Sequence, residues 1–139
     1  MAVTNFRVSE TAALLGVSDD TVRRWADAGR LELRRGDNGP AVIDGARVAA
    51  LAQELASDSA LQAAFPSSRA SARNRLTGIV TKVTKDGVMA QVEIQAGPFR
   101  IVSLMSREAA DELGLEPGSL ATASVKATTV VVDLPEVGR

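Results

Sequence analysis

The sequence predicts an α+β protein of two small domains, and three observations support this prediction. Up to about residue 65, apolar residues recur at helical spacing, whereas from Ser71 onward they alternate with polar residues, as in strands with one buried face. Between these regions, residues 66–70 read Pro-Ser-Ser-Arg-Ala, a composition typical of a linker. We therefore expect a mainly helical domain over residues 1–65 and a β domain over residues 71–139.

The first helix is expected to begin at Ser9, whose hydroxyl can accept a bond from a backbone N–H of the first turn. Its apolar face consists of Ala12, Leu14 and Leu15, and Gly16 ends it because glycine readily adopts the left-handed conformation. A short apolar helix of this kind is expected to pack against a neighbour.

The second helix has an equally clear start, because Ser18 can cap it and two acidic residues follow. Val22, Trp25 and Ala26 share one face and are expected to be buried. Gly29 then closes the helix.

A hairpin and a third helix complete the predicted domain. Residues 31–35 and 40–43 can pair around the turn-forming residues 36–39, and Asp44 can cap a helix that follows. The buried residues of that helix recur at helical spacing, and they are Val48, Leu51 and Leu55. Two helices, a tight turn and a hairpin wing are typical of a winged helix-turn-helix head that reads DNA.

This region resembles the MerR superfamily, and within it the short BldC-like and excisionase-like heads. The resemblance covers residues 5 to 56 and lies in Val17, Ser18, Thr21, Val22, Arg24, Trp25, Gly29 and Leu31. It implies double-stranded DNA as a partner. The implied DNA-binding residues are polar side chains of the second helix and the wing, namely Ser18, Thr21, Arg23, Arg24, Arg34 and Arg35. The alternative is that these arginines only pair with neighbouring acids on a solvated surface.

Composition narrows the possible functions. The chain has no Cys and no His, which excludes disulfides, Cys/His zinc sites and imidazole acid–base chemistry; we expect no catalytic residue, no bound metal cation and no enzyme activity. No apolar run approaches the ~20 residues that cross a bilayer, so we expect a cytoplasmic protein without a membrane partner. Because the net charge is −1, a DNA-binding surface would have to be a local cluster.

The second domain is expected to be a small OB-like barrel. Asp86-Gly87 reads as a hairpin turn, and in the strand that follows the predicted buried face holds Val88, Ala90, Val92 and Ile94. Ser106 caps a short helix whose inward residues are Ala109, Ala110 and Leu113, and Gly114 ends it. Five strands are predicted, over residues 76–84, 88–95, 99–104, 120–126 and 129–134. With one helix between the third and fourth, they fit a five-stranded Greek-key β-barrel.

The second domain resembles the TOBE domain, also called the Mop or molbindin-like domain. The resemblance covers residues 71 to 134 and lies in Ser71 to Asn74, Leu76, Gly78, Leu113 to Leu115, Gly118, Lys126, Ala127 and Val130. That family binds molybdate or tungstate between paired domains, which implies a homo-oligomer, a dimer or higher, held by these domains. A tetrahedral dianion removed from water needs several donors. The implied ligands are Ser71, Ala72, Arg73, Ser106, Lys126 and Ala127.

Together these resemblances predict a transcriptional regulator that binds DNA and senses molybdate or tungstate as an effector. Two other functions are possible. One is a cytoplasmic molybdate or tungstate binding or storage protein, and the other is an architectural DNA binder whose second domain serves only assembly. In that last case, Ser71 to Asn74 would only bond to the backbone where the second domain begins. Lys126 would be a charged residue on an edge strand that prevents aggregation.

Overall fold

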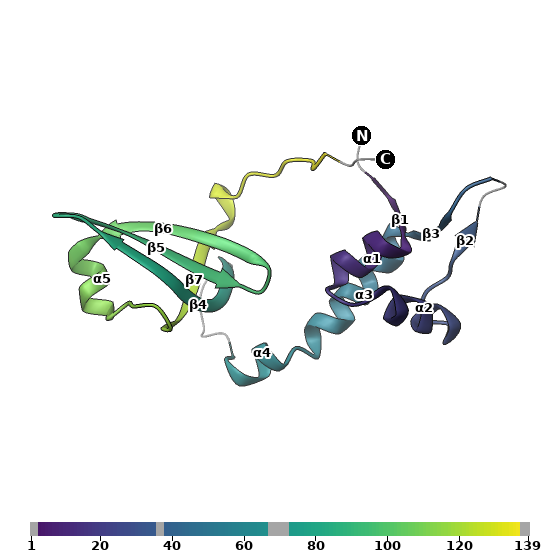
Figure 1. Ribbon diagram of the computed structural model, residues 1–139, viewed down its shortest axis with the longest axis horizontal. Coiled ribbons are helices and arrows are strands. Elements are labelled where there is room, and N and C mark those ends of the chain that lie inside the picture. Colours follow the sequence, from purple (N-terminus) through teal and green to yellow (C-terminus); the bar gives the residue numbers. More distant parts are fainter. Residues whose placement is uncertain (1–2, 36–37, 67–72, 137–139) are drawn as a thin grey trace. The chain divides into compact units, whose positions relative to one another are not determined.

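The computed structural model describes residues 3–35, 38–66 and 73–136. Contacts divide the chain into two compact units, Met1–Pro66 and Ser67–Arg139, and each is described by itself (Figure 1). The first is mainly helical and the second is mainly β, which confirms an α+β protein of two domains. The predicted linker at residues 66–70 stays a prediction, since most of it lies outside the described residues.

The first unit combines helices with a small sheet. Its elements are β1 (Asn5–Arg7), α1 (Val8–Leu15), α2 (Asp19–Asp27), β2 (Arg34–Arg35), β3 (Ala41–Asp44), α3 (Gly45–Ser57) and α4 (Ala60–Ala64). The strands pair antiparallel in the order β1-β3-β2, so the predicted hairpin is formed by β2 and β3 (Figure 1). The core contains Ala12, Val22, Leu31, Ile43, Val48 and Leu51, and Trp25 packs against it from a partly buried position.

The start of α1 differs from the prediction. Ser9 lies inside the first turn, and the helix begins after Arg7, whose backbone N–H donates to the Glu10 carboxylate at 2.8 Å. The reason is that β1, which the sequence did not predict, pairs with β3 up to Arg7 and fixes where the helix begins. Leu14, which the sequence places on the apolar face of this helix, is 60% exposed.

The remaining helix boundaries of this unit follow the sequence closely. Ser18 caps α2, its hydroxyl accepting the Thr21 N–H, and Gly16 closes α1 in the left-handed conformation. Asp44 stands at the start of α3, but its side chain makes no capping bond and lies 3.7 Å from Arg34 instead. The wing is thereby tied to the start of α3.

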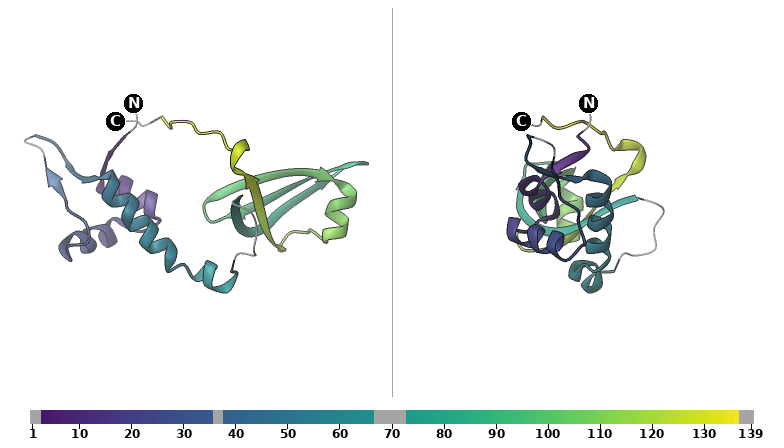
Figure 2. Two further views of the ribbon diagram at one scale, coloured as in Figure 1. Left: turned by 180° about the vertical axis from the view of Figure 1, so that it is seen from behind. Right: turned by 90° about the vertical axis from the view of Figure 1, so that its right-hand side faces the viewer.

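The second unit is a strongly bent antiparallel sheet with one helix. Its elements are β4 (Arg73–Lys85), β5 (Met89–Ala96), β6 (Phe99–Ser106), α5 (Arg107–Leu113), β7 (Leu120–Lys126) and a short 3₁₀ turn (Ala127–Thr129). The strand order is β6-β5-β4-β7, and α5 packs against β5 and β6 (Figure 2). Val80, Val92 and Ile94 form the buried core. Ser106 caps α5 and Gly114 ends it, as the sequence predicts.

Three expectations for this unit are wrong. Val88 lies in the turn and is 73% exposed, because the Asp86 carboxylate accepts the backbone N–H groups of both Val88 and Met89. Leu113, at the end of α5, is 68% exposed. The predicted fifth strand is not formed either: within the described residues the sheet has four strands, and residues 130–135 are extended but unpaired. The 3₁₀ turn redirects the chain there, with Thr129 Oγ1 donating to the Lys126 carbonyl at 2.9 Å.

Candidate functional site

Helix α2 carries two rows of polar residues on its exposed sides. In the first row, Ser18 Oγ lies 3.0 Å from Thr21 Oγ1, and Arg24 donates to Thr21 Oγ1 at 3.1 Å. These three residues, predicted to bind DNA, therefore form one continuous hydrogen-bonded row. Because the Ser18 hydroxyl already accepts the Thr21 N–H at 3.1 Å, its first role is to cap the helix.

The second row contains Asp19, Arg23 and Asp27, each one helical turn apart. Arg23 lies 3.8 Å from Asp20, and the two side chains are 58% and 91% exposed. An ion pair this exposed contributes little to stability, since solvent screens it. The Arg23 guanidinium is therefore available to bind another anion.

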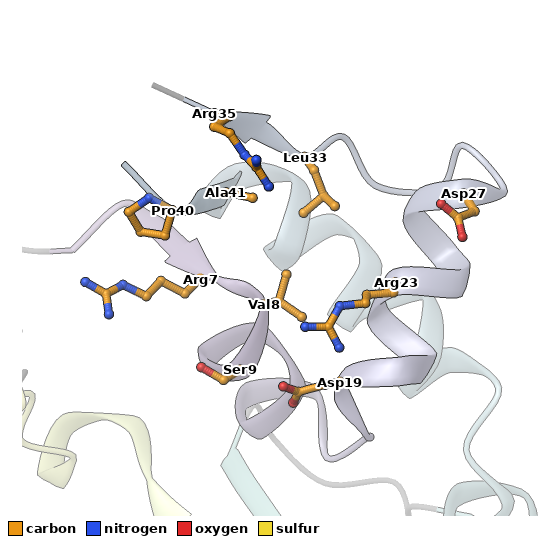
Figure 3. Close-up of a pocket in the computed structure, with 10 residues that line it drawn as sticks. All are labelled: Arg7, Val8, Ser9, Asp19, Arg23, Asp27, Leu33, Arg35, Pro40 and Ala41. Atoms are coloured by element: carbon orange, nitrogen blue, oxygen red, sulfur yellow. The ribbon is translucent and has the colours of Figure 1, made fainter. Parts of the chain in front are cut away.

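This second row forms one wall of a hollow of about 500 Å³ (Figure 3). We call this hollow the arginine groove; it is lined by Arg7, Val8, Ser9, Asp19, Arg23, Asp27, Leu33, Arg35, Pro40 and Ala41. Arg23 reaches into it from α2 and Arg35 from β2, with Val8 and Leu33 between them (Figure 3). Two predicted DNA-binding residues that are twelve positions apart in sequence thus share one cavity.

Arg34 lies on the other side of the wing. Its guanidinium is 3.7 Å from the Asp44 carboxylate and 3.4 Å from the side-chain oxygen of Asn5. It lines a separate hollow of about 430 Å³ together with Arg30 and Arg47. The separation follows from strand geometry, in which successive side chains point to opposite faces. Of the two predicted wing residues, only Arg35 joins Arg23.

Arg7 is a candidate that the sequence reasoning missed. It stands immediately before α1 and lines the arginine groove. A basic residue next to a helix start was the available signal, but the expected helix began at Ser9 and strand β1 was not predicted. Strand β1, paired with β3, is what positions Arg7.

In the second unit, two predicted oxyanion ligands lie opposite one another. Arg73 begins β4 and Lys126 ends β7, and the two are direct partners in the antiparallel register. Ala127 follows in the 3₁₀ turn. Ser71 and Ala72 lie outside the described residues, and for Arg73 only the backbone is described. Residues far apart in sequence are thus brought to one end of the sheet.

Ser106 is at the opposite end of that sheet. It pairs with Met89 at the end where β4 finishes at Lys85, twelve residues along β4 from Arg73. Its hydroxyl accepts the Ala109 N–H at 3.0 Å as the cap of α5. A single copy of the chain therefore does not bring Ser106 together with Lys126.

Two acidic groups of this unit have shifted pKa values, and both are structural. The backbone N–H groups of Met89 and Val88 lower the pKa of Asp86, and the hydrogen bond from Lys85 lowers the pKa of Asp111. Both carboxyls are therefore ionised at neutral pH and unsuited to proton transfer. In the part of the chain that the structure describes, no three acidic residues cluster so as to hold a metal ion, and no helix is long and apolar enough to span a membrane.

Two family models match the chain. The model of a helix-turn-helix domain, of the excisionase-like type, matches residues 6–55, and the model of the TOBE domain matches residues 70–132. The matched regions fall in the first and second units, respectively.

The similar proteins each match slightly less than half of this chain. Molybdenum-pterin-binding protein 2 of Clostridium pasteurianum is 41% identical over 63 residues, which are 45% of this chain and 93% of that protein. The molybdenum-pterin-binding protein MopA of Rhodobacter capsulatus is 41% identical over 68 residues; these are 48% of this chain but only 26% of MopA. A solved molybdate-binding protein from Sporomusa ovata is 32% identical, with a TM-score of 0.44, over 47% of this chain and 97% of its own.

Proposed function

Because this chain belongs to the TOBE family, with a helix-turn-helix domain before its TOBE domain, we propose that it is a cytoplasmic transcriptional regulator that binds double-stranded DNA and senses molybdate or tungstate. The observation that favours it most is the arginine groove beside α2, in a domain of the DNA-binding type. The proposal contains no catalytic step.

Helix α2 is the proposed recognition helix. Thr21 and Arg24 form an exposed hydrogen-bonded pair that can meet base edges in the major groove, where a guanidinium is well suited to guanine. Arg23 and Arg35 line the arginine groove of the protein, beside this helix, and would contact the DNA backbone. Arg34, paired with Asp44, is assigned a smaller role at the edge of the interface.

The TOBE domain is the proposed oxyanion sensor. Its relatives include proteins named for binding molybdenum-pterin, and Lys126 offers an exposed ammonium group next to the backbone of Arg73 and Ala127. Ammonium, hydroxyl and backbone N–H donors suit a tetrahedral dianion. Since Ser106 is remote from Lys126 within one chain, we assign it to the same site only if it comes from a second copy.

The proposed active form is therefore a homo-oligomer joined through the TOBE domains. In one copy, β6 and β7 are the edge strands of the sheet, and a hollow of about 450 Å³ lies among Ile101, Met105, Leu115, Ala121 and other apolar residues. The segment after the 3₁₀ turn exposes Val131 and Val132 by 82% and 85%. Exposed strand edges readily accept another strand, so we propose that this segment of one copy completes the sheet of its partner.

Sensing then follows from differential affinity. An oxyanion held at an interface between two copies favours the arrangement of the copies that closes that interface. This arrangement would also set the distance between the two helix-turn-helix domains. Two heads would read half-sites about one helical turn apart, or a multiple of it.

The test combines two titrations of the purified chain. Calorimetry with molybdate, tungstate and sulfate measures oxyanion binding, and DNA selection from a random-sequence duplex pool measures sequence preference with and without the bound anion. The proposal predicts a preferred DNA sequence and an affinity for it that changes when molybdate or tungstate is present. Equal DNA affinity with and without each of these oxyanions would refute the sensor.

A storage function is the second candidate, because the relatives described above are named for binding molybdenum-pterin. In that case the assembled TOBE domains would bind oxyanion regardless of DNA. Sequence-preferring DNA binding by the intact protein would exclude storage as the main function.

A further inference from the structure

We propose that the arginine groove holds one sugar–phosphate strand of the duplex, and that Arg7 binds one phosphate of that strand while Arg23 and Arg35 face others (Figure 3). The inference rests on the proposed DNA-binding function and extends it to a residue and a cavity that the family match does not assign. Its basis is the shape, the charge and the apolar floor of this cavity.

The shape follows from which elements form the walls. Helix α2 forms one wall, the β2–β3 wing forms the other, and the end of β1 with the start of α1 lies between them (Figure 3). When a recognition helix enters the major groove and a wing lies beside it, the DNA backbone at the edge of that groove must pass between them. The arginine groove is the space available for it.

The charges fit a phosphate strand. The three guanidinium groups come from three separate elements: Arg7 from β1, Arg23 from α2 and Arg35 from β2. The head's ion pairs among the described residues involve Arg23, Arg30, Arg34 and Arg47, so Arg7 and Arg35 belong to none of them. Guanidinium groups without a carboxylate partner are suited to bidentate phosphate binding.

The apolar and acidic residues of the arginine groove determine how the sugar–phosphate strand would lie in it. Val8 and Leu33 offer apolar surface to deoxyribose carbons, and Leu33 is 39% exposed. Asp19 and Asp27 repel phosphates on the α2 side. The strongest phosphate contacts are therefore expected at Arg7 and Arg35, and a weaker one at Arg23, which lies between the two carboxylates.

The test measures the salt dependence of binding to a fluorescently labelled random-sequence duplex of about 30 base pairs, roughly three helical turns. Each lost phosphate contact lowers the slope of log affinity against log salt by about 1. Arg7→Ala and Arg35→Ala should each produce this change, and the double variant should lower the slope by about 2. Arg7→Lys, which keeps the charge, should restore most of the slope.

Folding does not obscure the result, because the Arg7 side chain makes no capping bond and its backbone N–H remains for Glu10. Lys82→Ala is the control, since Lys82 is an exposed cation on β4 in the other unit. Unchanged slopes in Arg7→Ala and Arg35→Ala, with salt-dependent binding by the unmodified protein, would refute this inference alone. If the unmodified protein does not bind the duplex at any salt concentration, the proposed DNA-binding function fails as well.

Discussion

The two units differ in how complete they are within one chain. Among its described residues, the helix-turn-helix unit has a core of six buried apolar residues, and its candidate residues Arg23 and Arg35 line one cavity within a single copy. The TOBE unit leaves β6 and β7 as edge strands, exposes the valines of its last segment, and places Ser106 far from Lys126. The proposed DNA site therefore belongs to each copy, whereas the proposed oxyanion site needs two copies, and in such an arrangement a ligand can control pairing.

The largest effect is expected from introducing acidic residues into the segment after the 3₁₀ turn, which contains Val131 and Val132. Val131→Asp combined with Val132→Asp should prevent assembly, because two carboxylates would enter the apolar space at the sheet edge. Light scattering should show a monomer, and calorimetry should show loss of molybdate binding. DNA binding by a single head should persist at low salt.

Val88→Asp is the matched control for this change. Val88 is exposed to a similar degree, but it lies in the turn between β4 and β5 and not in the segment after the 3₁₀ turn. Assembly should be unaffected. A Val131→Asp/Val132→Asp protein that still forms the oligomer would show that the TOBE unit does not depend on this segment.

The next effect separates the two sites. Arg24→Ala should lower specific DNA affinity by about 1–3 kcal/mol, roughly 5- to 150-fold, because it removes the proposed base contact. Oxyanion binding should stay unchanged. Lys126→Ala should instead weaken molybdate binding and leave the affinity of one head for DNA intact, as measured by calorimetry and anisotropy. Equal damage to both activities by either variant would contradict the division of labour.

A substitution in one unit should also change the free energy of unfolding of that unit alone. A Cβ on Gly78 would lie 2.9 Å from the Ala96 Cα of β5, a contact that requires the strands to move apart. Gly78→Ala should therefore destabilise the TOBE unit by about 1–3 kcal/mol in urea unfolding, while the helix-turn-helix unit unfolds as before. Gly87→Ala is the control, because nothing lies within 4 Å of a Cβ there. Equal stabilities of the two variants would mean that this close approach is unimportant.

The sequence predicts the elements whose signals are local. Ser18 and Ser106 cap the helices assigned to them, and Gly16 and Gly114 end their helices, because capping depends on a few consecutive residues. Strand β1 and the fifth strand were misjudged because strand formation depends on a partner that is distant in sequence. Asn5–Arg7 has a partner in β3, whereas residues 129–134 have no strand partner among the residues that the structure describes.

The candidate sites show the same limit. Spacing on α2 correctly separated Val22 from the exposed Arg23 and Arg24. It could not show that Arg35 shares a cavity with Arg23 while Arg34 turns toward Asp44, because this depends on the pairing of β2 with β3. Nor could it find Arg7, whose position depends on β1. Contacts between elements, unlike helix faces, are not encoded in local periodicity.

The smallest predicted effect concerns pH and the TOBE unit alone. The hydrogen bond from Lys85 lowers the pKa of Asp111 in the folded state, so the folded state holds this proton less strongly than the unfolded chain. The resulting stability is present above the unfolded pKa of about 3.9 and is lost as pH falls through the lower folded value. Asp111→Asn should therefore lower the urea midpoint of the TOBE unit slightly at neutral pH, and the difference from the unmodified protein should vanish in acid. Glu112→Gln, at an exposed position on the same helix, is the control. A difference that persists at low pH would mean that Asp111 acts through packing and not through its charge.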